Sequence, residues 1–92
     1  MQLQWSRRAY VDLQRLHDFL AEKDPLAAAL TVERLAAAPE VLLLHPRQGQ
    51  RLKAYAPSEV RRLLVGPYEL HYQIVRDQLY VLSLWHTREW RP

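Results

Sequence analysis

The first half of the chain places apolar residues at the spacing of amphipathic helices. A short alternating segment, Gln2 to Trp5, predicts a strand, and Ser6 then stands where a helix N-cap is expected. Alanine and leucine recur every three or four residues after it, which predicts a helix from about Arg7 to Lys23. The pair Asp24-Pro25 is a second start signal, because aspartate caps helices and proline is tolerated in their first turn.

A second, alanine-rich helix is expected after this start signal. Its small side chains allow close packing on the first helix, so the two are predicted to form a helical hairpin. Pro39 cannot donate a backbone hydrogen bond to the carbonyl of Leu35, which predicts a kink or two abutting helices. Pro46 and Gly49 then end the helical region.

The second half changes to the alternating pattern of β-strands. A possible strand from Gln50 to Tyr55 precedes three clearer segments, Glu59 to Val65, Tyr68 to Val75 and Gln78 to His86. Alternation in the second of these indicates one buried face, whereas the last segment is apolar on both faces, which predicts a central strand. We therefore expect an α+β fold in the order β-α-α-β-β-β, with the helical hairpin packed on a four-stranded antiparallel sheet.

Composition narrows the class of protein. The 92 residues suffice for one domain, residues 1–92, and 49% of them are hydrophobic, which predicts a globular chain. Cysteine is absent, which excludes disulfides, thiol catalysis and thiolate metal sites. The histidines lack metal-ligand spacing, so neither a metal nor another cofactor is expected. No apolar run reaches the roughly 20 residues of a membrane span, and the first residues lack a signal-peptide core, so a cytoplasmic protein with no membrane partner is expected.

An ordered series of short motifs runs nearly end to end. The series comprises "W-S-x-x-A-x-x-D-L" from Trp5, "DPLAA" from Asp24, "L-x-x-H-P-x-x-G" from Leu42, "E-V-R-x-L-x-V-G-x-Y-x-L-x-Y" from Glu59 and "V-L-x-L-W-H-x-R" from Val81. In this series the chain resembles the RelE/ParE superfamily of type II toxin–antitoxin toxins. The resemblance implies a small bacterial toxin in a hetero-oligomer with a cognate antitoxin, which lays a helix or an extended strand on apolar grooves of the toxin.

Two activities occur in this superfamily, and both stay open here. RelE-like members cut mRNA in the ribosomal A site. ParE-like members inhibit DNA gyrase by protein contact and are not nucleases. The ending "LWHTREWRP" resembles ParE-like chains, and RelE-type sheets carry more lysine and arginine, so the ParE-like branch is favoured. The net charge of +3 does not decide between the two activities, because an acidic protein and RNA phosphates would both attract a mildly basic surface.

Candidate residues follow from these two alternatives. A ribonuclease needs a group at the ribose 2′-OH, cations at the phosphate and an acid for the leaving oxygen. The candidates for that chemistry are Arg61, His86 and Arg88, with Arg51, Lys53 and Arg62 as further cations. A histidine with a pKa of about 6.5 suits proton transfer. The candidates for contact with gyrase are His86, Arg88 and Trp90.

The candidates for antitoxin binding lie on the first helix and the central hairpin. They are Leu13, Leu16, Leu20, Arg61, Tyr68 and Tyr72. Arg61 must be paired if it points to the core, because burying a lone guanidinium is costly. Glu59 on the same strand face and Glu69 across the turn are the available acids, so a role in fold or antitoxin pairing is favoured over catalysis.

Overall fold

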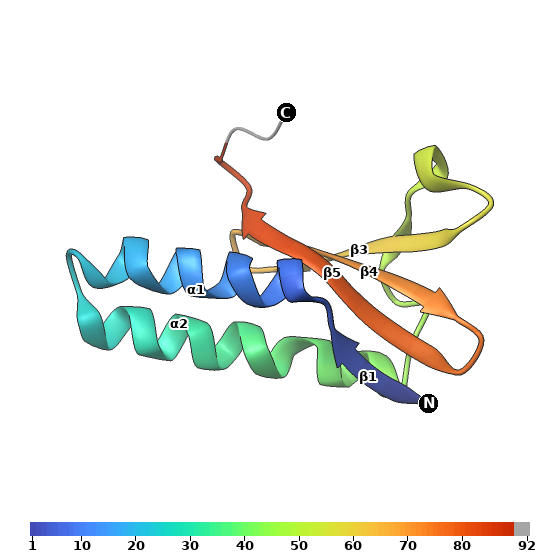
Figure 1. Ribbon diagram of the computed structural model, residues 1–92, viewed down its shortest axis with the longest axis horizontal. Helices are drawn as coiled ribbons and strands as arrows, with labels where there is room; N and C mark the ends of the chain where they lie inside the picture. The colour runs from blue at the N-terminus through green and yellow to red at the C-terminus, as the bar shows by residue number, and fades with distance from the viewer. Residues whose placement is uncertain (90–92) are drawn as a thin grey trace.

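Two layers, a helical hairpin and a twisted sheet, make up the computed structural model, which describes residues 1–89 (Figure 1). The elements in chain order are β1 (Gln2–Trp5), α1 (Arg7–Ala21), α2 (Pro25–Ala37), the 3-10 helix η1 (Ala38–Leu43), β2 (Gln50–Arg51), the 3-10 helix η2 (Lys53–Tyr55), β3 (Glu59–Val65), β4 (Tyr68–Val75) and β5 (Gln78–His86). The hairpin of α1 and α2 extends past the sheet at its turn (Figure 1). That end of α1 therefore lacks the sheet as a neighbour.

The helices begin at the residues that the sequence indicates. The side chain of Ser6 accepts a hydrogen bond from the Ala9 N–H at 3.0 Å, and that of Asp24 accepts one from the Ala27 N–H at 3.0 Å. Each bond satisfies an N–H that the helix itself cannot pair. At Ala38 the chain changes from α-helix to 3-10 helix, with proline in the first turn, so the predicted break is confirmed.

The sheet has five strands in the order β1-β5-β4-β3-β2. The central position predicted for β5 is confirmed. The sheet is mixed, however, because β1 runs parallel to β5 while the other neighbours are antiparallel. Only Gln50–Arg51 of the possible strand from Gln50 to Tyr55 pairs with β3, and the chain then turns into η2. The helical α+β architecture is as expected, with one strand more than predicted and one parallel pair.

A register shift explains why β5 is apolar on both faces. Tyr72 faces Val81, whereas His71 faces Ser83, so one extra residue of β5 lies between these pairs. Val81 and Leu84 therefore both point to the core, although their spacing is odd. Trp85 is the cross-strand neighbour of Glu69 on the face without helices. The shift changes which residues of β5 are buried, and sequence alternation alone does not show it.

The first motif fixes α1 to β5. The Ser6 N–H donates to the Val81 carbonyl at 2.9 Å, and the Ser6 hydroxyl donates to the Leu82 carbonyl at 2.9 Å. The Leu84 N–H donates to the carboxylate of Asp12 at 3.1 Å, and Asp12 is only 4% exposed. The Leu82 carbonyl and the Leu84 N–H, which lie beyond the end of β1, thus find side-chain partners at the N-cap of α1 and within it.

The "H-P-x-x-G" motif shapes a loop that closes on Tyr72. The Tyr72 hydroxyl donates to the Pro46 carbonyl at 2.7 Å and accepts from the Gly49 N–H at 3.0 Å. A Cβ at Gly49 would lie 2.5 Å from the Arg62 carbonyl oxygen and 2.8 Å from the Tyr72 ring, so only glycine fits. This loop is therefore held from beneath by a buried side chain of the sheet.

Candidate functional site

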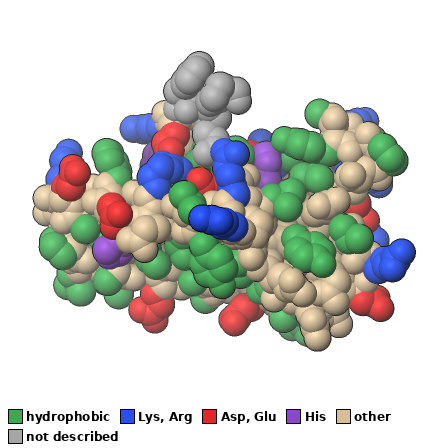
Figure 2. Space-filling view, viewed as in Figure 1, with side chains coloured by type: hydrophobic (Ala, Val, Ile, Leu, Met, Phe, Trp, Pro, Cys, Tyr) green, Lys and Arg blue, Asp and Glu red, His purple; other side chains and the backbone are tan. Residues whose placement is uncertain are grey.

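A groove lies where the second half of α1 passes the start of β4 and the end of β5. Its volume is about 600 Å³, within the range of ligand pockets. The lining residues are Arg15, Leu16, Phe19, Leu20, Tyr68, His86, Arg88 and Glu89. Figure 2 shows Lys and Arg side chains gathered over the middle of α1 and hydrophobic side chains spread over the projecting end of the helices. We call this hollow the α1 groove.

Apolar side chains form most of the α1 groove. Leu16 is buried at its base, whereas Phe19 is 67% exposed on its wall. The Tyr68 ring packs edge-on against His86, with 5.2 Å between the ring centres. Burial raises the pKa of the Tyr68 phenol, and the negative charge of Glu89 raises it further. The groove thus offers an apolar wall with a neutral phenol and an imidazole at one side.

Charged side chains form the rim of the α1 groove. Arg15 and Glu89 make an ion pair, with 2.6 Å between Nη1 and Oε2. The other carboxylate oxygen of Glu89 accepts from the His86 N–H at 2.9 Å. The Arg88 N–H donates to Nδ1 of His86 at 3.0 Å, so the proton of the neutral imidazole is assigned to Nε2. Within residues 1–89 the guanidinium of Arg88 has no ion pair.

A second group of polar side chains lies on the face of the sheet without helices. Nε2 of His71 is 2.7 Å from Oε2 of Glu69, and the two side chains are 13% and 16% exposed. The ring of Trp85 stands edge-on to His71 with 4.5 Å between centres, and Tyr55 lies 6.4 Å away. Arg62 approaches Glu69 at 3.6 Å. We call these five residues the His71 cluster.

The geometry of the His71 cluster suits proton transfer. The carboxylate of Glu69 fixes one ring nitrogen of His71, and within residues 1–89 the other ring nitrogen has no hydrogen-bond partner. A histidine held in this way can accept a proton through its free nitrogen. Arg62 adds a cation beside the pair, which would favour an anionic ligand.

Arg61 has a structural role. Its Nε donates to Glu59 at 2.8 Å, and its Nη1 donates to the Gly49 carbonyl at 2.7 Å. Arg47 also pairs with Glu59, at 3.0 Å. The hydrogen bond from Arg61 is the main reason that the pKa of Glu59 lies below its ordinary value, and Arg47 contributes to the same shift. The expected pairing of Arg61 with Glu59 is confirmed, whereas Glu69 lies on the other face and pairs with His71 and Arg62.

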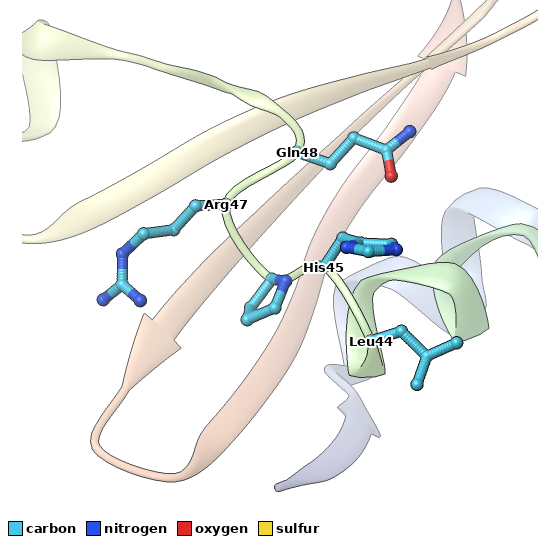
Figure 3. A pocket seen from close by; sticks show the side chains of 5 residues that line it. Leu44, His45, Arg47 and Gln48 are labelled. Carbon is cyan, nitrogen blue, oxygen red and sulfur yellow. The ribbon is translucent and has the colours of Figure 1, made fainter.

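The loop that Arg61 supports has a shallow hollow of its own. It is lined by Leu44, His45, Pro46, Arg47 and Gln48. Figure 3 shows His45 and Gln48 on one side of this loop and Arg47 pointing away on the other. The polar groups do not converge on a common point, so the loop offers no candidate ligand site.

The structure brings together some of the predicted residues and separates others. Leu16, Leu20, Tyr68, His86 and Arg88 all line the α1 groove. Leu13 lines a different hollow, with Tyr10, Gln14, His17 and Val32. Trp90 lies outside the described residues.

The geometry does not favour two of the candidate assignments. Tyr72 was a candidate for antitoxin contact, with the core as its other expected place, and it is 0% exposed with two internal hydrogen bonds. Arg61 was expected to share a nuclease site with His86 and Arg88. Arg61 is instead the cross-strand neighbour of Tyr72, while His86 is that of Tyr68, at the far end of β4.

Several residues of these surfaces were not predicted from the sequence. Glu69 and His71 are two residues apart on a strand, a spacing that places both side chains on one face and could have indicated the pair. Arg15 and Glu89 meet across 74 residues, and no local pattern indicates such a contact. No helix in the described part of the chain is both long and apolar enough to cross a membrane. Residues 1–89 also hold no group of three or more His, Asp or Glu side chains arranged for a metal ion.

Comparison with known proteins agrees with this fold. Residues 3–90 match the family described as "ParE toxin of type II toxin-antitoxin system, parDE". Toxin RelE2 of Caulobacter vibrioides is 29% identical over 87 residues, which cover 94% of each chain. A solved structure described as the chromosomal ParDE TA system from P. aeruginosa superposes with a TM-score of 0.79 at 22% identity, covering 94% of this chain and 95% of the other. The chain therefore belongs to the ParE toxin family of type II toxin–antitoxin systems, within the RelE/ParE superfamily.

Proposed function

We propose that this toxin acts in the bacterial cytoplasm by binding DNA gyrase, and that a cognate antitoxin neutralises it by occupying the α1 groove. The observation that carries the proposal is the groove itself, an apolar surface with exposed Phe19 on its wall and two arginines on its rim. Apolar grooves of this kind receive amphipathic helices from partner proteins. Membership of the ParE toxin family of type II toxin–antitoxin systems supports the antitoxin as a partner. The resemblance of the ending "LWHTREWRP" to ParE-like chains supports gyrase as the target.

Protein contact is favoured over catalysis because the expected nuclease residues do not converge. Arg61 is engaged with Glu59 and the Gly49 carbonyl, away from the α1 groove. Within residues 1–89 the guanidinium of Arg88 makes no ion pair, and arginine is among the residues that dominate binding energy in protein interfaces. We therefore keep His86, Arg88 and Trp90 as the proposed gyrase contacts.

A second candidate function is cleavage of mRNA at the ribosome, favoured by the His71 cluster. The free ring nitrogen of His71 would take the proton of a ribose 2′-OH, and that oxygen would attack the adjacent phosphorus. The bond to the 5′ oxygen breaks, the oxygen leaves with a proton from water, and a 2′,3′-cyclic phosphate remains. Arg62 would stabilise the charge that develops on the phosphoryl oxygens.

One pair of assays separates the two functions. Purified toxin is added to a gyrase supercoiling and cleavage assay and to a translation reaction in which the ends of the mRNA are mapped. The variants are Arg88→Ala, His71→Ala and, as a matched exposed control, Lys23→Ala. We expect inhibited gyrase with intact message, an effect weakened by Arg88→Ala and unchanged by the other two. Codon-dependent cuts with normal supercoiling, lost in His71→Ala, would replace the first proposal with the second.

A further inference from the structure

The cationic rim of the α1 groove is already occupied by a carboxylate of the same chain. Glu89 lies in the turn after β5 and reaches across to Arg15, with 2.6 Å between Oε2 and Nη1. Its other oxygen accepts the His86 N–H, so both oxygens are used. The position of this carboxylate beside an apolar groove is the position in which a partner's aspartate or glutamate would meet Arg15.

The contact between Arg15 and Glu89 is easily exchanged. The side chains are 41% and 27% exposed, so water reaches both groups. Ion pairs at this degree of exposure contribute little to stability, because solvent screens them and the long side chains lose freedom. An incoming carboxylate can therefore take the place of Glu89 without unfolding any element.

The charge around the groove favours an acidic partner segment. Glu89 is the single acid among the lining residues within 1–89, whereas Arg15 and Arg88 are both cationic. Once Glu89 is displaced, Arg15 still approaches Asp12, with 3.8 Å between Nη2 and Oδ1, and its Nη1 is open to an incoming carboxylate. The rim would then present Arg15 and Arg88 beside an apolar surface that includes Phe19. A segment that carries one large apolar side chain followed by Asp or Glu complements both parts of this surface.

We propose that Glu89 is an internal competitor for the antitoxin. The α1 groove binds an antitoxin segment with a large apolar residue and a neighbouring carboxylate, and that carboxylate displaces Glu89 from Arg15. This inference rests on the proposed function, because it takes the occupant of the groove to be the antitoxin. The apparent affinity is then the intrinsic affinity multiplied by the fraction of toxin in which Glu89 has left Arg15.

Calorimetric titration of the whole toxin tests this inference. The probes are the product of the open reading frame adjacent to the toxin gene, tested as the antitoxin, and overlapping synthetic peptides that cover it. Glu89→Gln removes the charge but keeps an oxygen that can accept the His86 N–H. We expect this variant to bind the antitoxin and one acidic peptide about threefold to tenfold more tightly. The exposed Glu22→Gln on the same helical hairpin is the matched control and leaves the affinity unchanged.

Two further variants complete the design. Phe19→Ala is expected to weaken binding about tenfold or more, because it removes an exposed aromatic anchor. When Glu89→Gln is combined with Arg15→Gln, the gain in affinity is expected to vanish. No guanidinium then remains at position 15 for the carboxylate of Glu89 or that of the antitoxin. The melting temperature of each variant, measured beforehand, confirms that the toxin is folded.

The outcomes separate this inference from the proposed function. If the antitoxin binds, but Glu89→Gln and Phe19→Ala leave its affinity unchanged, the groove inference is overturned while neutralisation by an antitoxin stands. If neither the antitoxin nor any peptide binds the wild-type toxin, both are overturned. Self-association that depends on Phe19, seen by sedimentation without antitoxin, would assign the groove to a second copy of the chain and also overturn the inference.

Discussion

Individual residues that look like site candidates turn out to hold the fold. Tyr72 and Arg61 both reach the loop that ends at Gly49, the first by two hydrogen bonds of its hydroxyl and the second by a bond to the Gly49 carbonyl. The strand period correctly places Tyr72 on the buried face. It does not show that the hydroxyl meets a loop 23 residues earlier in the chain, so the structural role could not be predicted.

Removing the Tyr72 hydroxyl tests this role. We expect Tyr72→Phe to lower the free energy of unfolding by about 1–3 kcal/mol, because the buried Gly49 N–H loses its acceptor. Tyr55→Phe, at a side chain that is 49% exposed, is the matched control and should change it by about 0.5 kcal/mol or less. Urea unfolding measures both. Equal losses in the two variants would contradict the assignment.

The Arg61–Glu59 pair makes stability depend on pH. The hydrogen bond from Arg61 lowers the pKa of Glu59 below its ordinary value of 4.5, so the unfolded chain binds this proton at a higher pH than the folded chain does. The contribution is therefore fully present above pH 4.5 and is lost as the pH falls through the lower folded pKa. In urea unfolding across this range, Glu59→Gln should flatten the decline, whereas the exposed Glu40→Gln should not. A decline that is the same in all three proteins would contradict this.

At the scale of elements, local patterns predicted the structure where the determinants are local. The two N-caps, the break at Pro39 and the alternating faces of β4 were all visible in the sequence and are confirmed. The parallel pairing of β1 with β5 joins segments 76 residues apart, and a four-residue strand carries no pattern that selects its neighbour. The register shift in β5 likewise depends on its pairing with β4, which local alternation does not show.

The attachment of α1 to β5 depends on the buried carboxylate of Asp12. We expect Asp12→Ala to lower the free energy of unfolding by about 1–3 kcal/mol, because the Leu84 N–H is left buried without this acceptor. Amide hydrogen exchange at Leu84 should accelerate in the same variant. Asp18→Ala, on the exposed side of the same helix, is the control. Unchanged exchange at Leu84 would contradict this role for Asp12.

At the scale of the whole molecule, the two candidate surfaces lie on opposite faces of the sheet. Tyr68 of the α1 groove is on the face that packs on the helices. His71 is three residues further along β4, so its side chain is on the opposite face. The sequence placed several groove residues on suitable elements, but only the fold shows that they meet around Phe19 and Arg15. An antitoxin segment in the groove therefore need not cover the His71 cluster.

This separation predicts a pattern of spectral changes. When the antitoxin binds, NMR signals of the Tyr68 and His86 rings should shift, while the His71 ring should keep its chemical shifts. Binding in the groove changes the surroundings of the first two rings only. Shifts at His71 with unchanged Tyr68 would place the antitoxin on the other face.

The chain is a toxin that an antitoxin is proposed to neutralise, and the survival of cells that express it is the most direct measurement of this. The toxin gene is induced in a bacterial host with and without the neighbouring reading frame, and colony-forming cells are counted over time. The account predicts a steep fall in viable counts with the toxin alone and full recovery when the neighbour is co-expressed. Undiminished counts with soluble, folded toxin, or a fall that the neighbour does not reverse, would contradict it.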